Sequence, residues 1–174
     1  MTQAALTSAD IFPTDGTIYI DFTQVDVVAT GETAPDDASG AKVETNKGGA
    51  LYCKVGTGGC TAGDFVSIST SATTGIRTVV KLDTTDSGST PKKGAIAIST
   101  ALVDNYAWFL FEDLNQVPVN VANSVSTATG LTTTATAGQL GAGGDTVFGI
   151  LTNEASGASG LTSCSSIGAL GTNI

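Results

Sequence analysis

The sequence contains no histidine, and only 13% of its 174 residues are charged, against about 25% in an average soluble domain. Histidine is the commonest general base and the commonest metal ligand in proteins. Its absence excludes Ser-His-Asp and Cys-His nucleophilic centres and the HExxH zinc motif. We therefore expect no catalytic, metal-binding or cofactor-binding residues and do not expect an enzyme.

Basic residues are absent from both ends of the chain. All seven lie between positions 42 and 93, and the formal net charge is −9. Binding to nucleic-acid phosphates requires clustered lysine and arginine, so no nucleic-acid partner is expected. The acidic balance either keeps a sparsely charged protein soluble or favours docking against a basic or complementary protein surface.

Long apolar runs are also missing. No stretch approaches the roughly 18 residues of a membrane-spanning helix, and the first residues lack the basic and apolar regions of a signal peptide. We expect synthesis in the cytoplasm and no membrane partner.

The three cysteines are too few for a scaffold built on disulfides and lack the spacing of a zinc site. Cys53 and Cys60 flank a glycine-rich turn. This spacing leaves two alternatives, a local disulfide across a hairpin or a pair of buried thiols. Cys164 is expected to be a buried thiol.

Threonine and glycine are abundant, with 28 and 22 residues. Alternation of apolar and polar residues with period two, together with many β-branched side chains, predicts short strands. The clearest lies at residues 76–83, where the face with Val80 and Leu82 is expected to pack inward and the face with Val79 outward. Residues 105–111 carry Trp108 and are apolar on both faces, which predicts a central strand buried on both sides.

Turn clusters separate the expected strands, and no segment has the pattern of a long amphipathic helix. This organisation predicts an all-β fold, either a small β-sandwich or a partly closed β-barrel. The other expected strands lie at residues 17–22, 50–55, 64–69, 94–99, 117–122, 131–134 and 146–152.

The ends of the chain differ from its middle. Residues 1–47 hold one apolar strand with no local partner and predict an extended N-terminal arm. Residues 48–152 form the expected β-domain. Residues 153–174 are small and polar, and predict an irregular C-terminal tail.

Few residues suggest catalysis. Asp104, with Glu112 or Asp113, flanks the aromatic strand and offers a carboxylate pair of the kind that cleaves glycosides. Such enzymes line their subsites with several aromatic side chains, whereas aromatics make up 6% of this chain. We interpret Asp113 as part of the turn after the strand.

The order of several motifs resembles that of the capsid decoration (cement) proteins of tailed bacteriophages. A step Gly-Asp-x-Val opens an early strand, a strand beginning Tyr-Ala-Trp is followed by a valine-rich strand, and an apolar-Gly-apolar step comes later. The segments that carry the resemblance are Ala62-Gly-Asp-Phe-Val66, Lys93-Gly-Ala-Ile-Ala-Ile, Tyr106-Ala-Trp-Phe-Leu-Phe, Val117-Pro-Val-Asn-Val-Ala, Leu131-Thr-Thr-Thr-Ala-Thr-Ala-Gly-Gln-Leu140 and Val147-Phe-Gly-Ile150.

The resemblance covers residues 60–152, and two departures are visible. Pro118 and Asn120 interrupt the valine-rich strand, and residues 1–50 match no pattern of the family. The resemblance implies a homotrimer on the outer surface of an assembled capsid, where it bridges neighbouring major capsid subunits without turnover. The alternative is a virion or surface β module that polymerises alone, as a tail-tube, fibre or surface-layer subunit does.

Apolar residues of the N-terminal segment are the candidate contacts with the capsid or with a sister protomer, because an unpaired strand can add to the edge of another sheet. The alternative is that these residues form one more core strand of the same protomer. The candidates are Ile11, Phe12, Ile18, Ile20 and Phe22.

Overall fold

The computed structural model describes residues 42–45, 47–84, 92–142, 144 and 146–172, and within them the chain forms strands and loops without a helix. The all-β expectation is therefore confirmed. In chain order the strands are β1 (Lys42–Thr45), β2 (Gly48–Val55), β3 (Phe65–Thr70), β4 (Arg77–Lys81), β5 (Lys92–Ala97), β6 (Tyr106–Glu112), β7 (Val117–Val121), β8 (Gly130–Thr133), β9 (Leu140–Gly141), β10 (Thr146–Thr152) and β11 (Gly160–Thr172).

Strands β2 to β6 close into a five-stranded barrel. The pairing order is β2-β4-β3-β5-β6, and β6 returns to β2. Only the β2–β4 pair is parallel. Closure satisfies the backbone groups that an open sheet would leave unpaired at its edges. We call this unit the first barrel; β1 is added as a hairpin on the outer side of β2.

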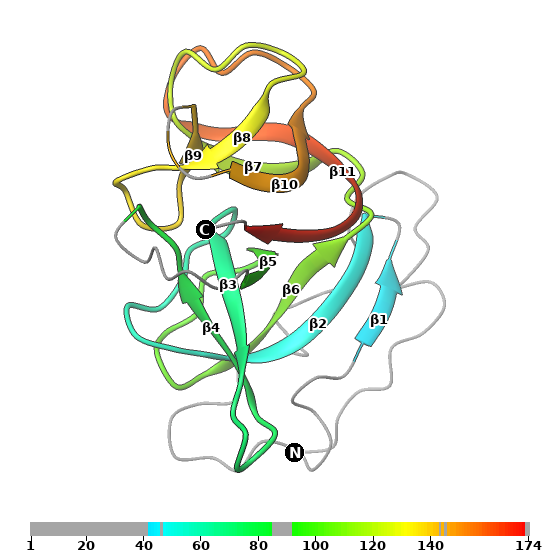
Figure 1. The fold of residues 1–174 in the computed structure, drawn as a ribbon, viewed down its shortest axis with the longest axis vertical. Helices are drawn as coiled ribbons and strands as arrows, with labels where there is room; N and C mark the ends of the chain where they lie inside the picture. The colour runs from blue at the N-terminus through cyan, green and yellow to red at the C-terminus, as the bar shows by residue number, and fades with distance from the viewer. Residues whose placement is uncertain (1–41, 46, 85–91, 143, 145, 173–174) are drawn as a thin grey trace.

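Strands β7 to β11 close in the same way, and we call them the second barrel. Their pairing order is β7-β9-β8-β10-β11, with β11 returning to β7, and the β7–β9 pair is the parallel one. Strand for strand, this repeats the connectivity of the first barrel. Figure 1 shows the second barrel above the first, with β8 to β11 in yellow to red.

Strand β6 is the wall between the two hydrophobic cores. Ala107, Phe109 and Phe111 belong to a cluster inside the first barrel. Tyr106 and Trp108 face the other way, into a cluster that continues through the second barrel. The expected central strand, buried on both faces, is confirmed. The inner cluster of the first barrel also includes Leu51, Cys53, Val55, Val66, Val79, Ala95 and Ala97.

The orientation expected for the strand at residues 76–83 is wrong. Val79 is buried in the first barrel, whereas Val80 is only partly buried. Leu82 is buried as expected, but it lies beyond the end of β4 and packs in the other cluster. The single apolar Val79 faces inward, although its two neighbours on that face are Arg77 and Lys81.

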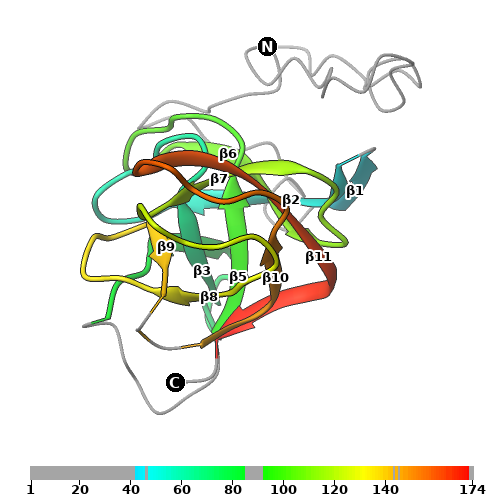
Figure 2. The ribbon, with the colours of Figure 1, turned by 90° about the horizontal axis from the view of Figure 1, so that it is seen from above.

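The irregular C-terminal tail expected at residues 153–174 is also wrong. Residues 160–172 form β11, the longest strand among those described. Its first half pairs with β7, and its last residues reach the first barrel, where Ala169 lies opposite Glu112 and Gly171 opposite Lys93. Figure 2 shows β11 as one long curved strand.

A polar cluster at the start of β3 fastens the two barrels together. Asp64 is buried and accepts hydrogen bonds from the Thr61 backbone N–H (2.9 Å) and the Asn120 side chain (3.2 Å), and Lys81 Nζ lies 3.8 Å away. Asn120, from β7, also donates its backbone N–H to the Gly63 carbonyl at 2.8 Å. The Gly-Asp step of the sequence is therefore a structural joint between the barrels.

Candidate functional site

Six large apolar side chains are exposed among the described residues. Exposed apolar residues indicate a contact surface only when they cluster, because single exposed apolar side chains are normal. They fall into two groups on different barrels and one isolated residue on β11. The six are Leu102, Val103, Phe148, Leu151, Leu161 and Ile167.

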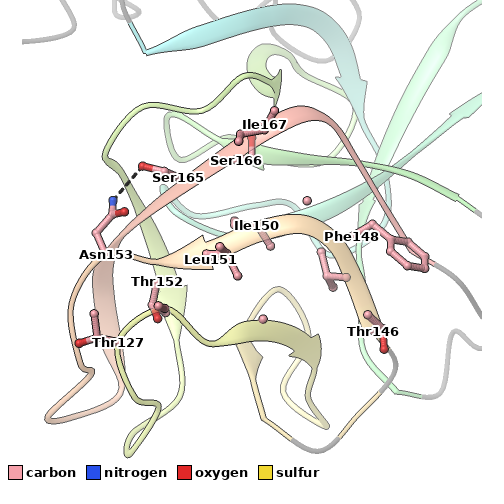
Figure 3. Close-up of a pocket in the computed structure, with 14 residues that line it drawn as sticks. Thr127, Thr146, Phe148, Ile150, Leu151, Thr152, Asn153, Ser165, Ser166 and Ile167 are labelled. Carbon is pink, nitrogen blue, oxygen red and sulfur yellow. Dashed lines mark hydrogen bonds between the residues drawn. The ribbon is translucent and has the colours of Figure 1, made fainter.

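The larger group lies on the outer face of β10 and β11 around a groove of about 730 Å³. We call this surface the second-barrel patch and define it by Phe148, Leu151 and Ile167, which are 47%, 49% and 94% exposed. Figure 3 shows Phe148 and Leu151 on β10, on either side of Ile150, and Ile167 on the neighbouring β11. The described lining has no charged side chain; its remaining members are Thr127, Ala128, Gly130, Thr146, Val147, Gly149, Ile150, Thr152, Asn153, Ser165 and Ser166.

A β-bulge places Phe148 and Leu151 on the same face. Residues three apart in a regular strand point to opposite sides. Here the pairing with β11 shifts between Phe148 and Ile150, and Gly149 has a φ of 82°. This conformation is accessible to glycine at little cost and typical of a bulge. Ile150 consequently points into the core while Phe148 and Leu151 point to solvent.

Ile167 stands on an excursion of β11 opposite the same bulge. Over this stretch β10 advances by two residues while β11 advances by five, from Ser166 to Gly171. The excursion is fixed to the loop after β6, because Asp113 Oδ1 accepts a hydrogen bond from the Gly168 N–H at 2.7 Å, and the Asp113 N–H donates to the Gly168 carbonyl at 3.1 Å. Ile167 is thus a protruding side chain on a fixed backbone.

Hydrogen-bonded polar side chains border one end of the groove. The Asn153 side chain donates to Ser165 Oγ at 2.9 Å, the dashed line in Figure 3, and to Ser163 Oγ at 3.1 Å. Glu154 accepts a hydrogen bond from the Ser163 N–H at 3.0 Å. These bonds connect the loop after β10 to β11 and hold the border in place.

The second group, Leu102 and Val103, is at the tip of the loop between β5 and β6. Backbone hydrogen bonds in both directions between Cys60 and Ala101 hold the loop against the first barrel. After the tip, Asp104 has a φ of 65° and forms a 2.7 Å ion pair with Lys54. The hydrogen bond to Asp104 raises the pKa of Lys54. We call this group the loop tip.

The two exposed groups are at opposite ends of β6. The loop tip precedes Tyr106, and the Glu112 end pairs with the excursion of β11 that carries Ile167. Seven residues of strand span roughly 20 Å. The same separation keeps Asp104 away from Glu112 and Asp113, so the structure does not bring the sequence's carboxylate pair together.

The predicted contact residues of the N-terminal segment, Ile11, Phe12, Ile18, Ile20 and Phe22, lie outside the described residues. Of the two alternatives for the cysteines, the structure shows buried free thiols at Cys53, Cys60 and Cys164. Cys53 lies opposite Ala107 and Cys60 opposite Ala101, so the turn does not set the two thiols against each other. Desolvation raises the pKa of all three, to about 12 for Cys53 and Cys164.

The described ranges contain no group of three or more histidine, cysteine or acidic residues that could hold a metal ion. The same part of the chain contains no helix long and apolar enough to cross a membrane. Comparison with family models, curated proteins and solved structures finds no match to this chain.

Sequence reasoning located the strand of Phe148 and Leu151 but not their exposure. The available signal was Gly149 within an apolar run, since an isolated glycine in a strand often marks a bulge. Ile167 had no such signal, because its segment did not have the pattern of a strand.

Proposed function

We propose that this chain is a capsid decoration (cement) protein of a tailed bacteriophage. As a homotrimer it binds the outer surface of an assembled head and bridges neighbouring major capsid subunits. It acts by adhesion and performs no catalysis.

The observation that carries the proposal is the pair of exposed apolar surfaces at opposite ends of β6. An oligomer that bridges capsid subunits needs two separated contact surfaces on each protomer, one for the capsid and one for a sister copy, on a scaffold that does not bend between them. Three features supply such a scaffold: the outer face of β6, which packs on the core of the second barrel, the Asp64 joint, and the crossing of β11 onto the first barrel. Weak contacts repeated around an oligomer raise the overall affinity.

Strand pairing offers less support for the self-polymerising alternative. Among the described strands only β1 has a single neighbour. Closed barrels lack the free edges through which sheets add to one another. The sedimentation experiment distinguishes a self-polymerising module from a decoration protein.

The test mixes purified protein with phage heads assembled without this chain and sediments the mixture. We expect pelleting only when heads are present, and at least tenfold weaker binding for Leu102→Asp than for the wild type. Ala135→Asp is the control, because it adds the same charge at an exposed residue of the loop between β8 and β9, outside both groups. Filaments that pellet without heads would favour the self-polymerising module, and failure to bind heads would contradict the proposal.

A further inference from the structure

We infer that the second-barrel patch is a contact between copies of this chain, with Ile167 of one copy seated in the groove of the next. The inference rests on the proposed function for its biological role. The self-association itself is measurable without heads.

The shape of the patch fits a second copy of itself. One surface carries both a protruding side chain, Ile167, and a hollow beside it, with Leu151 in the lining. A chain that assembles with copies of itself carries both halves of the contact on its own surface, in one patch for a two-fold dimer or in two different patches for a ring such as a trimer. Gly149, Ala128 and Ser165 are small lining residues and let a second backbone approach closely.

The charge distribution favours a second copy over another partner. Of the net charge of −9, residues 1–41 contribute −7, residues 42–113 contribute zero because seven basic and seven acidic residues balance, and residues 117–172 contribute −2. Only 2 of the 23 charged residues, Asp145 and Glu154, lie in residues 117–172, whereas 14 lie in residues 42–113. The patch therefore lies on the part of the chain with the fewest charged residues, so it offers no charged group to a basic or acidic partner and matches the equally uncharged patch of a second copy.

Burial of an uncharged apolar patch is also what a contact between identical chains requires. The cores of such interfaces are depleted of charged residues and more apolar than the rest of the surface. Phe148 supplies an aromatic side chain that is half exposed in the single chain. Phenylalanine is one of the aromatic residues enriched at the cores of protein interfaces.

Light scattering over a range of concentrations tests the inference. The wild type is expected at three times the chain mass of 17.3 kDa, and Ile167→Asp at one chain mass. We expect at least a 100-fold rise in the dissociation constant for Ile167→Asp, because the contact would bury an unpaired charge. Ala135→Asp, at an exposed residue of the second barrel outside the groove, should keep the wild-type mass.

Thiol labelling gives a second measurement that does not depend on a disruptive charge. The native cysteines are buried, so a maleimide reports on an introduced one. We expect Ile167→Cys to react at least tenfold more slowly than Leu161→Cys at concentrations where the wild type is associated. Equal rates would overturn the inference even if Ile167→Asp failed to fold.

Other occupants of the groove give different results. A wild type that stays at one chain mass at 100 μM, or an Ile167→Asp oligomer as stable as the wild type, overturns the inference. If Ile20→Asp in the full chain abolishes association as Ile167→Asp does, the N-terminal segment of a neighbouring copy is the occupant, and contact between two patches is ruled out. Twice the chain mass, lost in Ile167→Asp, supports the contact and contradicts the proposed trimer.

Head binding separates this inference from the proposed function. An oligomer that depends on Ile167 but ignores heads leaves the copy contact standing and removes the decoration function. If the wild type stays at one chain mass and binds heads as well as Ile167→Asp does, the decoration function stands and the copy contact is removed.

Discussion

The two barrels share one pairing order but are filled differently. Inside the first barrel the cluster is aliphatic and aromatic, with Phe109 and Phe111 as its largest members. Among the residues that the structure describes, nine polar or charged residues are buried, and six of them lie in residues 130–172 of the second barrel: Thr133, Thr152, Ser156, Thr162, Ser166 and Thr172. Barrels with the same strand order can thus be packed with large apolar side chains or with smaller side chains that carry hydroxyl groups.

Hydrogen bonds to the backbone satisfy the hydroxyl groups of Thr152, Ser156 and Ser166, whereas the buried Thr172 hydroxyl has no such partner among the described residues. Ser156 Oγ donates to the Ala122 carbonyl at 2.6 Å and accepts from the Val125 N–H at 2.9 Å. Ser166 Oγ accepts from the Leu114 N–H at 2.9 Å. Burial of a polar group costs little once it is hydrogen-bonded. The surfaces differ too, since the first barrel carries most of the charges and the second the apolar patch.

The largest expected effect is a cavity in the first barrel. Phe109→Ala should lower the free energy of unfolding by about 4 kcal/mol, and Leu131→Ala in the second barrel by about 3 kcal/mol, because both side chains are fully buried. Urea unfolding followed by far-UV circular dichroism and by Trp108 fluorescence measures both. One shared transition is expected in each variant. Circular dichroism and fluorescence transitions that separate in either variant would show that the barrels unfold separately.

The joint between the barrels gives the next effect. Asp64→Ala removes the acceptor for the Thr61 N–H and the Asn120 side chain and should cost about 3 kcal/mol. Asp64→Asn keeps an acceptor oxygen and should cost less. A double-mutant cycle with Asn120→Ala should give a coupling of about 1 kcal/mol. If the losses in free energy of unfolding are additive, Asp64 does not connect the two barrels through Asn120.

The contrast between the barrels also explains how much the sequence could predict. The aromatic strand β6 was predicted with both faces correct, because its apolar residues leave no other interpretation. β11 was missed, because its inward residues Thr162, Cys164 and Ser166 are small or polar and hide the period-two pattern. Hydrogen bonds to distant backbone groups, which no local pattern encodes, stabilise that strand.

The contact surfaces were the least predictable part. Period-two alternation assigns a face to each residue only in a regular strand, and the patch depends on a bulge in β10 and an excursion of β11. Asp113 was interpreted as part of a turn, and it does lie in the loop after β6. Its hydrogen bond to Gly168 joins residues 55 positions apart.

A smaller effect isolates the hydroxyl groups of the second barrel. Thr152→Val preserves the shape of the side chain but removes the donor to the Ser126 carbonyl (2.7 Å) and the acceptor for the Thr129 N–H. We expect a loss of about 1.5 kcal/mol in the free energy of unfolding. The counterpart in the first barrel, Ser67→Ala, removes a longer 3.4 Å bond and should cost under about 0.5 kcal/mol. Equal losses would mean that the barrels do not differ in their use of hydroxyl groups.

The smallest effect compares a buried thiol in each barrel at alkaline pH. Desolvation raises the pKa of Cys53 and of Cys164 from an ordinary value of 9.0 to about 12. Between these values the unfolded chain releases the thiol proton and the folded chain retains it, so stability is complete below pH 9 and falls as pH rises toward 12. At pH 10 each thiol should lower the free energy of unfolding by about 1 kcal/mol.

Cys164→Ala should flatten the dependence of stability on pH between 8 and 10 by this amount, and Cys53→Ala should have the same effect in the first barrel. A Cys164→Ala profile parallel to the wild type, with Cys53→Ala flattened, would mean that the hydroxyl-lined second barrel solvates a thiolate and that its interior is the more polar of the two.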